Sequence, residues 1–149
     1  MAVPIPRQPA GIATAFVADI MRPGVLGCDP DTPLREVARM MAGHRIHSVV
    51  VHGITDRAGE RLVWGLVSDL DLARAIGEPL DERTAAEVAA TDVVTVAPED
   101  TVERAAQIMA EHETAHLIVA SDEGRRPIGV ISTLDLARAI ADAQTRTLV

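Results

Sequence analysis

The sequence predicts an α+β fold made of two copies of one β-α-β-β-α unit, and three observations support this. The segment GLVSDLDLARAI at 65–76 returns as GVISTLDLARAI at 129–140. Apolar residues recur with helical spacing once in each half of the chain. A short β-branched run follows each of these helical segments. The chain is therefore an internal repeat, with an offset of 68 residues upstream and 64 downstream.

Each copy opens with a short apolar run, at 25–28 in the first copy and 93–96 in the second. An amphipathic helix follows, because apolar residues stand at i, i+3, i+4 and i+7. These residues are Leu34, Val37, Ala38 and Met41, matched by Val102, Ala105, Ala106 and Met109. Thr32 before Pro33 predicts an N-cap and first-turn pair, and Asp100 with Glu103 predicts a capping box.

Two strands and a second helix complete each copy. The strands are expected at 48–51 and 62–67, and at 117–119 and 127–131. The four-residue difference between the offsets is placed in the hairpin loop between them, where insertions are tolerated. Ser68 and Ser132 open the second helices, the first of which should stop near Gly77. Short helices at 15–21 and 84–89 should precede the two copies.

The repeat also predicts the domain boundaries. One copy of about 60 residues would be marginal alone, so the two copies are expected to share a core. We expect a flexible tail at 1–13, a first domain at 14–77, a linker at 78–83, a second domain at 84–142 and a C-terminal tail at 143–149.

Composition excludes several classes of function. The chain of 149 residues is 48% hydrophobic but has no apolar stretch that could span a bilayer, and its start does not resemble a secretory signal. A single cysteine excludes an intrachain disulfide framework, so a cytoplasmic protein is expected. A net charge of −8 and almost no aromatic residues argue against nucleic acid or an anionic membrane as a partner.

The motif G-h-h-S-x-x-D, where h is apolar, occurs at the end of each hairpin and allows two interpretations. Serine followed three residues later by an acid is a capping box at a helix start. The same helix start offers free N–H groups to a phosphate, and the carboxylate could accept hydrogen bonds from a ribose. The motif alone does not decide between them. Its residues are Gly65, Ser68 and Asp71, and Gly129, Ser132 and Asp135.

Taken in register, the repeat resembles a cystathionine-β-synthase (CBS) domain, and the tandem resembles a Bateman module. The resemblance covers about 15–142 and rests on both G-h-h-S-x-x-D motifs, on the Asp/Thr-Pro-Leu helix start and on the order of elements. It implies two domains related by a pseudo-twofold axis with two clefts between them. Such modules often bind adenine nucleotides, S-adenosylmethionine or related molecules.

The resemblance implies roles for five matched pairs of residues. They are Ser68 and Ser132 as phosphate-contacting hydroxyls, Asp71 and Asp135 as ribose-binding carboxylates, Leu66 and Val130 beside the base, Leu26 and Val94 with backbone groups that can pair with adenine, and Ser48 and His116 at a phosphate-facing position that is often basic. Because serine stays neutral where histidine can be charged, the two clefts are expected to differ.

We therefore expect a stand-alone regulatory module, not an enzyme, that signals by conformational or oligomeric change. It should form a homodimer, need no cofactor and hold no metal, with an adenine nucleotide or S-adenosylmethionine as regulatory ligand and an unidentified regulated protein as partner. Histidines 44, 47 and 52 are read as solvated or capping, and Cys28 as a small buried hydrophobe. The alternative is a ligand-free dimerisation or scaffold module in which both S-x-x-D units are only helix caps.

Overall fold

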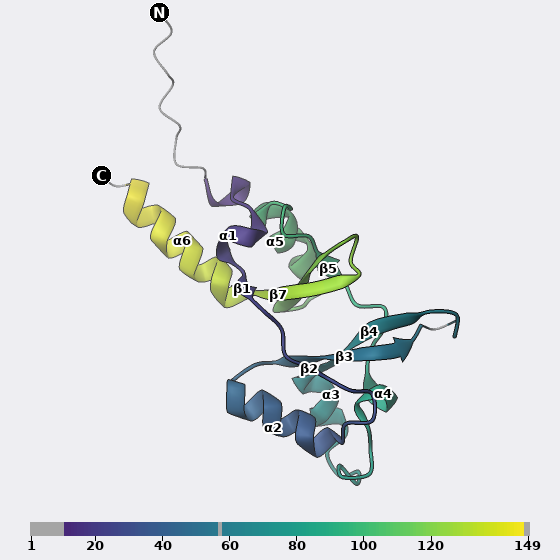
Figure 1. Ribbon diagram of the computed structural model, residues 1–149. Helices are drawn as coiled ribbons and strands as arrows, with labels where there is room; N and C mark the ends of the chain where they lie inside the picture. Colours follow the sequence, from purple (N-terminus) through teal and green to yellow (C-terminus); the bar gives the residue numbers. More distant parts are fainter. Residues whose placement is uncertain (1–10, 57, 148–149) are drawn as a thin grey trace, which may run out of the picture. The chain divides into compact units, whose positions relative to one another are not determined.

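The computed structural model describes residues 11–56 and 58–147, which divide into two compact units (Figure 1). We call residues Val25–Val93 the central unit. The terminal unit contains the chain up to Gly24 and from Val94 onward. Each unit contains one copy of the repeat, so the predicted α+β fold with two β-α-β-β-α copies is confirmed.

The central unit contains one three-stranded sheet with the order β2-β3-β4. Strand β2 is parallel to β3, and β3 is antiparallel to β4. Its elements are β2 (Gly27–Cys28), α2 (Leu34–His44), β3 (Ser48–Thr55), β4 (Leu62–Ser68), α3 (Asp69–Arg74) and α4 (Ala85–Val88).

The terminal unit repeats this arrangement and adds a strand, giving the sheet order β1-β7-β6-β5. Strands β5 and β6 are parallel, and the other two pairs are antiparallel. Its elements are η1 (Ile12–Thr14), α1 (Val17–Ile20), β1 (Arg22–Pro23), β5 (Thr95–Val96), α5 (Val102–Glu111), β6 (His116–Ser121), β7 (Arg126–Ser132) and α6 (Thr133–Thr147).

Each sheet buries one face against its own helices. Side chains alternate between the faces of a strand. In the central unit Val49, Val51 and Val67 are fully buried and pack with α2 residues such as Val37. In the terminal unit the matching residues pack with α1, α5 and α6, and they are Leu117, Val119 and Ile131. The opposite face of each sheet carries the residues that lie between these positions.

The short helix that precedes each copy packs on the other copy. The N–H of Val17 in α1 donates to the carbonyl of Asp100 at 2.8 Å, and the N–H of Ala85 in α4 donates to the carbonyl of Thr32 at 2.8 Å. Both short helices were predicted, but this packing was not. Each compact unit therefore contains one copy of the repeat together with the short helix that precedes the other copy. The contiguous domain boundaries 14–77 and 84–142 stay a prediction.

The proposed linker 78–83 also packs within the central unit. The Leu34 N–H, at the start of α2, donates to the Arg83 carbonyl at 2.9 Å. The Arg83 side chain also forms ion pairs with Glu78 and Glu87. These contacts hold the residues that follow α3 against the start of α2 and against α4.

Both predicted helix starts are corrected. Pro33 itself occupies the N-cap position of α2, without a side-chain cap, because the helix begins one residue later than expected. Thr101, not Asp100, caps α5 by accepting the Arg104 N–H at 3.1 Å. The Asp100 carboxylate instead accepts the Ala97 N–H at 2.9 Å, which closes the turn before the helix.

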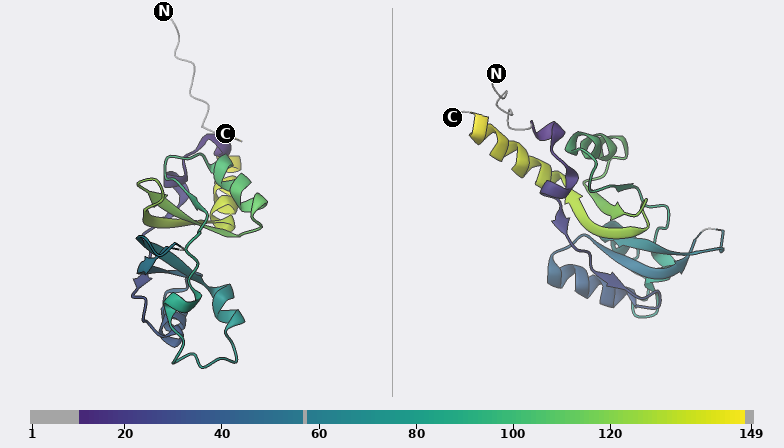
Figure 2. Two further views of the ribbon diagram at one scale, coloured as in Figure 1. Left: turned by 90° about the vertical axis from the view of Figure 1, so that its right-hand side faces the viewer. Right: turned by 45° about the horizontal axis from the view of Figure 1, so that its top comes forward.

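The hairpins and the last helix also differ from expectation. Strand β3 has 8 residues against 6 in β6, so two of the four extra residues lie in the strand, which contains a bulge between Val51 and Ile54. Helix α6 continues to Thr147 through the predicted tail at 143–149 (Figure 2). Most of the predicted tail at 1–13 lies outside the described residues. None of the described helices has the length and apolar character that crossing a bilayer requires.

Gly129 is the position where the N-terminal segment lies closest to β7. A Cβ there would lie 2.6 Å from the Arg22 carbonyl oxygen and 3.1 Å from the Met21 sulfur. The backbone oxygen would have to move, which would disturb the pairing of β1 with β7. The absence of a side chain at this position therefore allows the terminal unit to form its fourth strand.

We predict that Gly129→Ala lowers the free energy of unfolding by about 1–3 kcal/mol, the range for overpacked sites. Gly43→Ala in α2 is the matched control, because its Cβ would meet nothing within 4 Å. It should raise stability by about 0.5–1 kcal/mol, because glycine is a poor helix former. Urea denaturation measures both, and equal stability changes in the two variants would contradict the close packing of β1.

Candidate functional site

The same capping box forms at both strand-to-helix junctions. In the central unit the carboxylate oxygen Oδ2 of Asp71 accepts the Ser68 N–H at 2.8 Å and the Ser68 hydroxyl at 3.0 Å. The Ser68 Oγ in turn accepts the Asp71 N–H at 3.2 Å. In the terminal unit Ser132 and Asp135 make the same three bonds at the same lengths. Both boxes predicted from the sequence are present.

Within the box the serine hydroxyl acts both as a hydrogen-bond donor and as an acceptor. A carboxylate has no proton to give, so the Ser132 hydroxyl hydrogen points at Asp135 Oδ2. A phosphate could accept a bond from this hydroxyl only if that internal bond were exchanged. The second carboxylate oxygen, Oδ1, takes no part in the box.

Each Oδ1 lies beside an arginine, but the two arginines come from different elements. Asp71 Oδ1 accepts a hydrogen bond from Arg74 of the same helix at 3.4 Å. Asp135 Oδ1 lies 3.5 Å from Nε of Arg22, which belongs to β1. Asp135 is 6% exposed, whereas the Asp71 side chain is 22% exposed. The carboxylate in the terminal unit is therefore more deeply buried.

The predicted phosphate-facing residues lie directly opposite the two serines. Ser48 pairs with Ser68 across β3 and β4, and His116 pairs with Ser132 across β6 and β7. Directly opposed residues place their side chains on the same face. This face is the one opposite the core residues Val49, Val51 and Val67. Strand register therefore brings each pair together.

The residues predicted to flank the base extend the same sheet face. Leu66 lies opposite Val50, and the Val50 N–H donates to the Leu26 carbonyl at 2.9 Å. In the terminal unit Val130 lies opposite Ile118, whose parallel neighbour Thr95 directly follows Val94. The ten predicted residues thus form a central cluster (Leu26, Ser48, Leu66, Ser68, Asp71) and a terminal cluster (Val94, His116, Val130, Ser132, Asp135).

Backbone groups of the central cluster are partly occupied. The N–H and carbonyl of Leu66 both bond to Ala90 at 2.9 Å, and the Leu26 carbonyl is taken by Val50. Pairing of an adenine edge with the Leu26 carbonyl would therefore have to share that acceptor. The Val94 side chain in the terminal cluster is 38% exposed.

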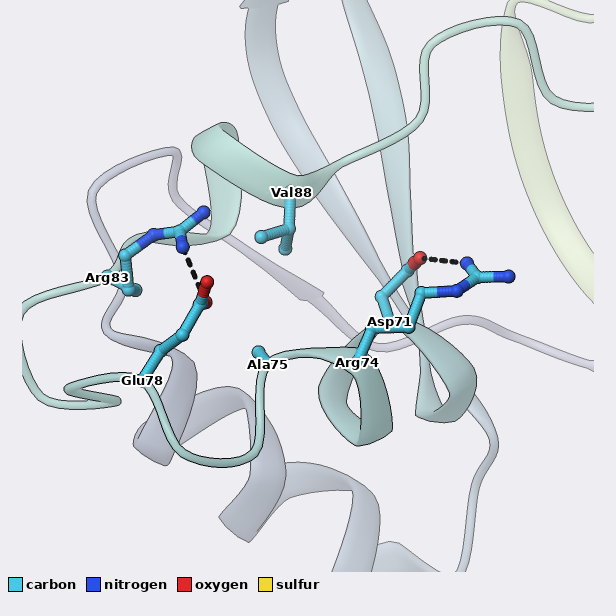
Figure 3. A pocket seen from close by; sticks show the side chains of 6 residues that line it. All are labelled: Asp71, Arg74, Ala75, Glu78, Arg83 and Val88. Carbon is cyan, nitrogen blue, oxygen red and sulfur yellow. Dashed lines mark hydrogen bonds and ion pairs between the residues drawn. The ribbon is translucent and has the colours of Figure 1, made fainter.

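A pocket of about 210 Å³ adjoins the central cluster (Figure 3). In Figure 3 the Asp71–Arg74 and Glu78–Arg83 pairs flank it, and Ala75 lies between them. Val88 completes the lining. Asp71 is the one predicted site residue on its wall. Pockets for drug-sized ligands measure about 300–1,000 Å³, so this hollow is too small for a whole nucleotide.

The histidine and cysteine singled out in the sequence have partners or surroundings that suit a structural role. The His47 Nδ1 lies 2.8 Å from the carboxylate of Asp69, the first residue of α3. Burial raises the pKa of the Cys28 thiol, a hydrogen bond with Thr32 opposes this, and the Asp29 charge adds to it. This favours the thiol over the reactive thiolate, in line with the predicted packing role. Across the described residues, no three His, Cys, Asp or Glu side chains gather as metal ligands.

Arg22 is the residue at the cluster that sequence reasoning missed. It precedes the first copy, yet β1 pairs with β7 of the second copy and brings its guanidinium to Asp135. The 68-residue offset matches Arg22 with Ala90, which shows that the two copies differ there. The offset does not show which carboxylate the arginine reaches.

Comparison with known proteins extends this description. The CBS domain family model matches residues 17–78 and 85–142. Protein YhcV of Bacillus subtilis, a CBS domain-containing protein, is 27% identical over 81% of this chain and 82% of its own length. A homoserine O-acetyltransferase of Methanocorpusculum labreanum is 27% identical over 83% of this chain, which spans only 24% of that enzyme.

Two solved structures share the fold. PAE2072 of Pyrobaculum aerophilum, a CBS domain protein complexed with AMP, has a TM-score of 0.68 and 29% identity, covering 87% of this chain and 98% of that one. The CBS domain pair of MJ0100, in complex with 5′-methylthioadenosine and S-adenosyl-L-methionine, has a TM-score of 0.68 and 22% identity, covering 84% and 98%.

Proposed function

We propose, from the premise that this chain belongs to the CBS domain family, that it is a regulatory module for an adenosine-type ligand of the AMP or ADP kind. Ligand binding would change its conformation or assembly and so signal to a regulated protein. The module would act by binding and not by catalysis. The observation that carries the proposal is the pair of identical Ser–Asp boxes, each with one carboxylate oxygen outside the cap.

The chemistry of each cluster suits a nucleoside. A carboxylate oxygen accepts hydrogen bonds from the two neighbouring hydroxyls of a ribose. Apolar side chains at Leu66 and Val130 provide the surface that a base needs. The AMP complex of PAE2072, with the same fold and 29% identity, supports an adenine nucleotide as the ligand.

A scaffold function without ligand is the second candidate, and one observation favours it. The Ser–Asp hydrogen bonds are all internal to the chain, so the boxes need no ligand to be complete. If Asp135 contacts a ligand, removing the charge of its carboxylate weakens ligand binding. If Asp135 is only a cap, the same change affects stability alone. Binding experiments on an Asp135 variant therefore separate the two candidates.

We predict that AMP raises the melting temperature, since a ligand that binds only the folded state adds about 2.7 kcal/mol at 100 times its Kd. Asp135→Asn should weaken AMP binding by about 1.5–3 kcal/mol, because hydrogen bonds to a charged acceptor are lost. Its apo stability should fall by no more than about 1 kcal/mol, because an amide keeps part of the cap.

Asp142→Asn is the control, because it makes the same charge change at an exposed position of α6. Calorimetry and thermal denaturation give binding and stability for both variants. A stable wild type that binds no adenosine, AMP, ADP or S-adenosylmethionine at millimolar concentration would favour the scaffold. Unchanged AMP affinity in Asp135→Asn would show that this residue is only a cap.

We further propose that two copies of the chain associate through α6 and through α3 with the turn that follows it. Equivalent positions leave large apolar side chains exposed: Leu70 and Ile76 at 56% and 77% in the central unit, and Leu134 and Ile140 at 52% and 48% in the terminal unit. Exposed apolar surface of this kind marks an interaction site. Its recurrence in both copies favours a second copy of the chain as the partner.

We predict that the protein sediments at twice its monomer mass of 15.8 kDa. Leu134→Glu with Ile140→Glu should give a folded monomer, because charges would be buried in the contact. Leu62→Glu, at a position 74% exposed on β4, should leave the dimer intact. Analytical ultracentrifugation distinguishes these, and a monomeric wild type or a dimeric double variant would refute this contact.

A further inference from the structure

We propose that Arg22 makes the terminal cluster selective for adenosine ligands that carry a negative charge, and that the central cluster lacks this selectivity. The inference rests on the proposed function, because it concerns the ligand of the same clusters. It assigns a specificity role to a residue outside the repeated motif. Arg22 reaches the cluster through the short strand β1.

The backbone fixes Arg22 beside the terminal cluster. Strand β1 pairs with β7, with Arg22 opposite Val130, and the Gly24 N–H donates to the Ile128 carbonyl at 2.7 Å. These contacts anchor the segment at the arginine and at the two residues that follow it. Its Nε lies 3.5 Å from Asp135 Oδ1, the oxygen that the capping box leaves out. The cation therefore stands where the ribose of a ligand would be held.

The guanidinium has more donors than this contact uses. A guanidinium has five N–H donors in a rigid plane, whereas Asp135 has only Oδ1 outside the box. The 3.5 Å separation is longer than an ordinary N–H···O bond, and the Arg22 side chain is 57% exposed. The remaining donors match the oxygens of a phosphate, which arginine binds in a bidentate manner. Arg22 can thus contact Asp135 and an anionic ligand group together.

In the central cluster the position that matches Arg22 is Ala90, whose side chain is only a methyl group. Ala90 bonds to Leu66 through both backbone groups at 2.9 Å, as the antiparallel partner of that residue. This is the place that Arg22 takes opposite Val130. The two residues therefore occupy matched pairing positions, although Arg22 lies in a two-residue strand and Ala90 forms an isolated bridge. Arg74 of α3 contacts Asp71 in the central cluster and matches Arg138 in sequence, but the arginine beside Asp135 is Arg22, from a strand outside the repeated motif.

Two further matched positions differ in ways that favour an anion in the terminal cluster. His116 stands opposite Ser132, where the central unit has neutral Ser48 opposite Ser68. Thr133 opens α6, where Asp69 opens α3 and brings a negative charge to that helix start. An anion is disfavoured by that charge. The terminal cluster is therefore the more favourable of the two for a phosphate.

A purely structural role of Arg22 makes a different prediction. If the arginine only held Asp135 in place, its removal would weaken all ribose-containing ligands by one factor. If it contacts the charged group, its removal would weaken a nucleotide more than the uncharged nucleoside. The ratio of the adenosine Kd to the AMP Kd separates these roles, because a change in the carboxylate affects both ligands alike.

The experiment measures AMP and adenosine binding by calorimetry at pH 8, where the phosphate, with a second pKa of about 6, is a dianion. Arg22→Ala should reduce the affinity ratio at the tighter AMP site by about tenfold or more, the size of a lost charge-assisted bond. Arg22→Lys keeps the charge and should retain part of the ratio. Ala90→Arg places the cation in the central unit and should strengthen AMP binding at the weaker site.

Apo melting temperatures establish that each variant is folded, and Arg22→Lys provides a test if Arg22→Ala is unstable. Equal weakening of AMP and adenosine in Arg22→Ala would overturn the specificity role while leaving the proposed function intact. Unchanged affinity for both ligands in a folded Arg22→Ala would do the same. A wild type that binds neither ligand would instead refute the proposed function, and this inference with it.

Discussion

The Ser–x–x–Asp box at each strand-to-helix junction is the interaction on which both candidate clusters depend. It caps the helix that follows the hairpin and fixes the orientation of a carboxylate at the end of the sheet. Asp135 is almost fully buried, and a buried carboxylate without hydrogen bonds would be costly. The box supplies those bonds through Oδ2 and leaves Oδ1 to face a partner. The cap of the fold and the proposed ligand contact thus depend on the same side chain.

The two copies use this common frame with different neighbours. In the central unit the second oxygen meets an arginine one helical turn away, and in the terminal unit it meets Arg22 from a strand outside the copy. Arg22 reaches Asp135 because the segment that precedes the first copy, with α1 and β1, packs on the second copy. One repeated backbone therefore presents two electrostatic environments around the same Ser–Asp box.

Much of this could be predicted from the sequence, because the evidence was local. Helical spacing placed α2 and α5, and the repeated serine and aspartate predicted both boxes, down to their residues. Packing of α1 on the second copy depends on contacts between distant segments, which no local pattern encodes. The Arg22–Asp135 pair was missed for that reason. The cap at Thr101 was missed because Asp100 and Thr101 are both good caps, and the turn before the helix decides between them.

The central claim is that these boxes are ligand sites as well as caps. Nuclear magnetic resonance of labelled protein titrated with AMP tests it most directly, through the backbone amides of the box residues. The account predicts saturable shifts of the Ser132 and Asp135 amides, because ligand binding at Oδ1 changes the bonds they make within the box. The amide of Gly43 in α2 should not move. Saturating AMP that leaves the amides of both boxes unshifted would contradict the account.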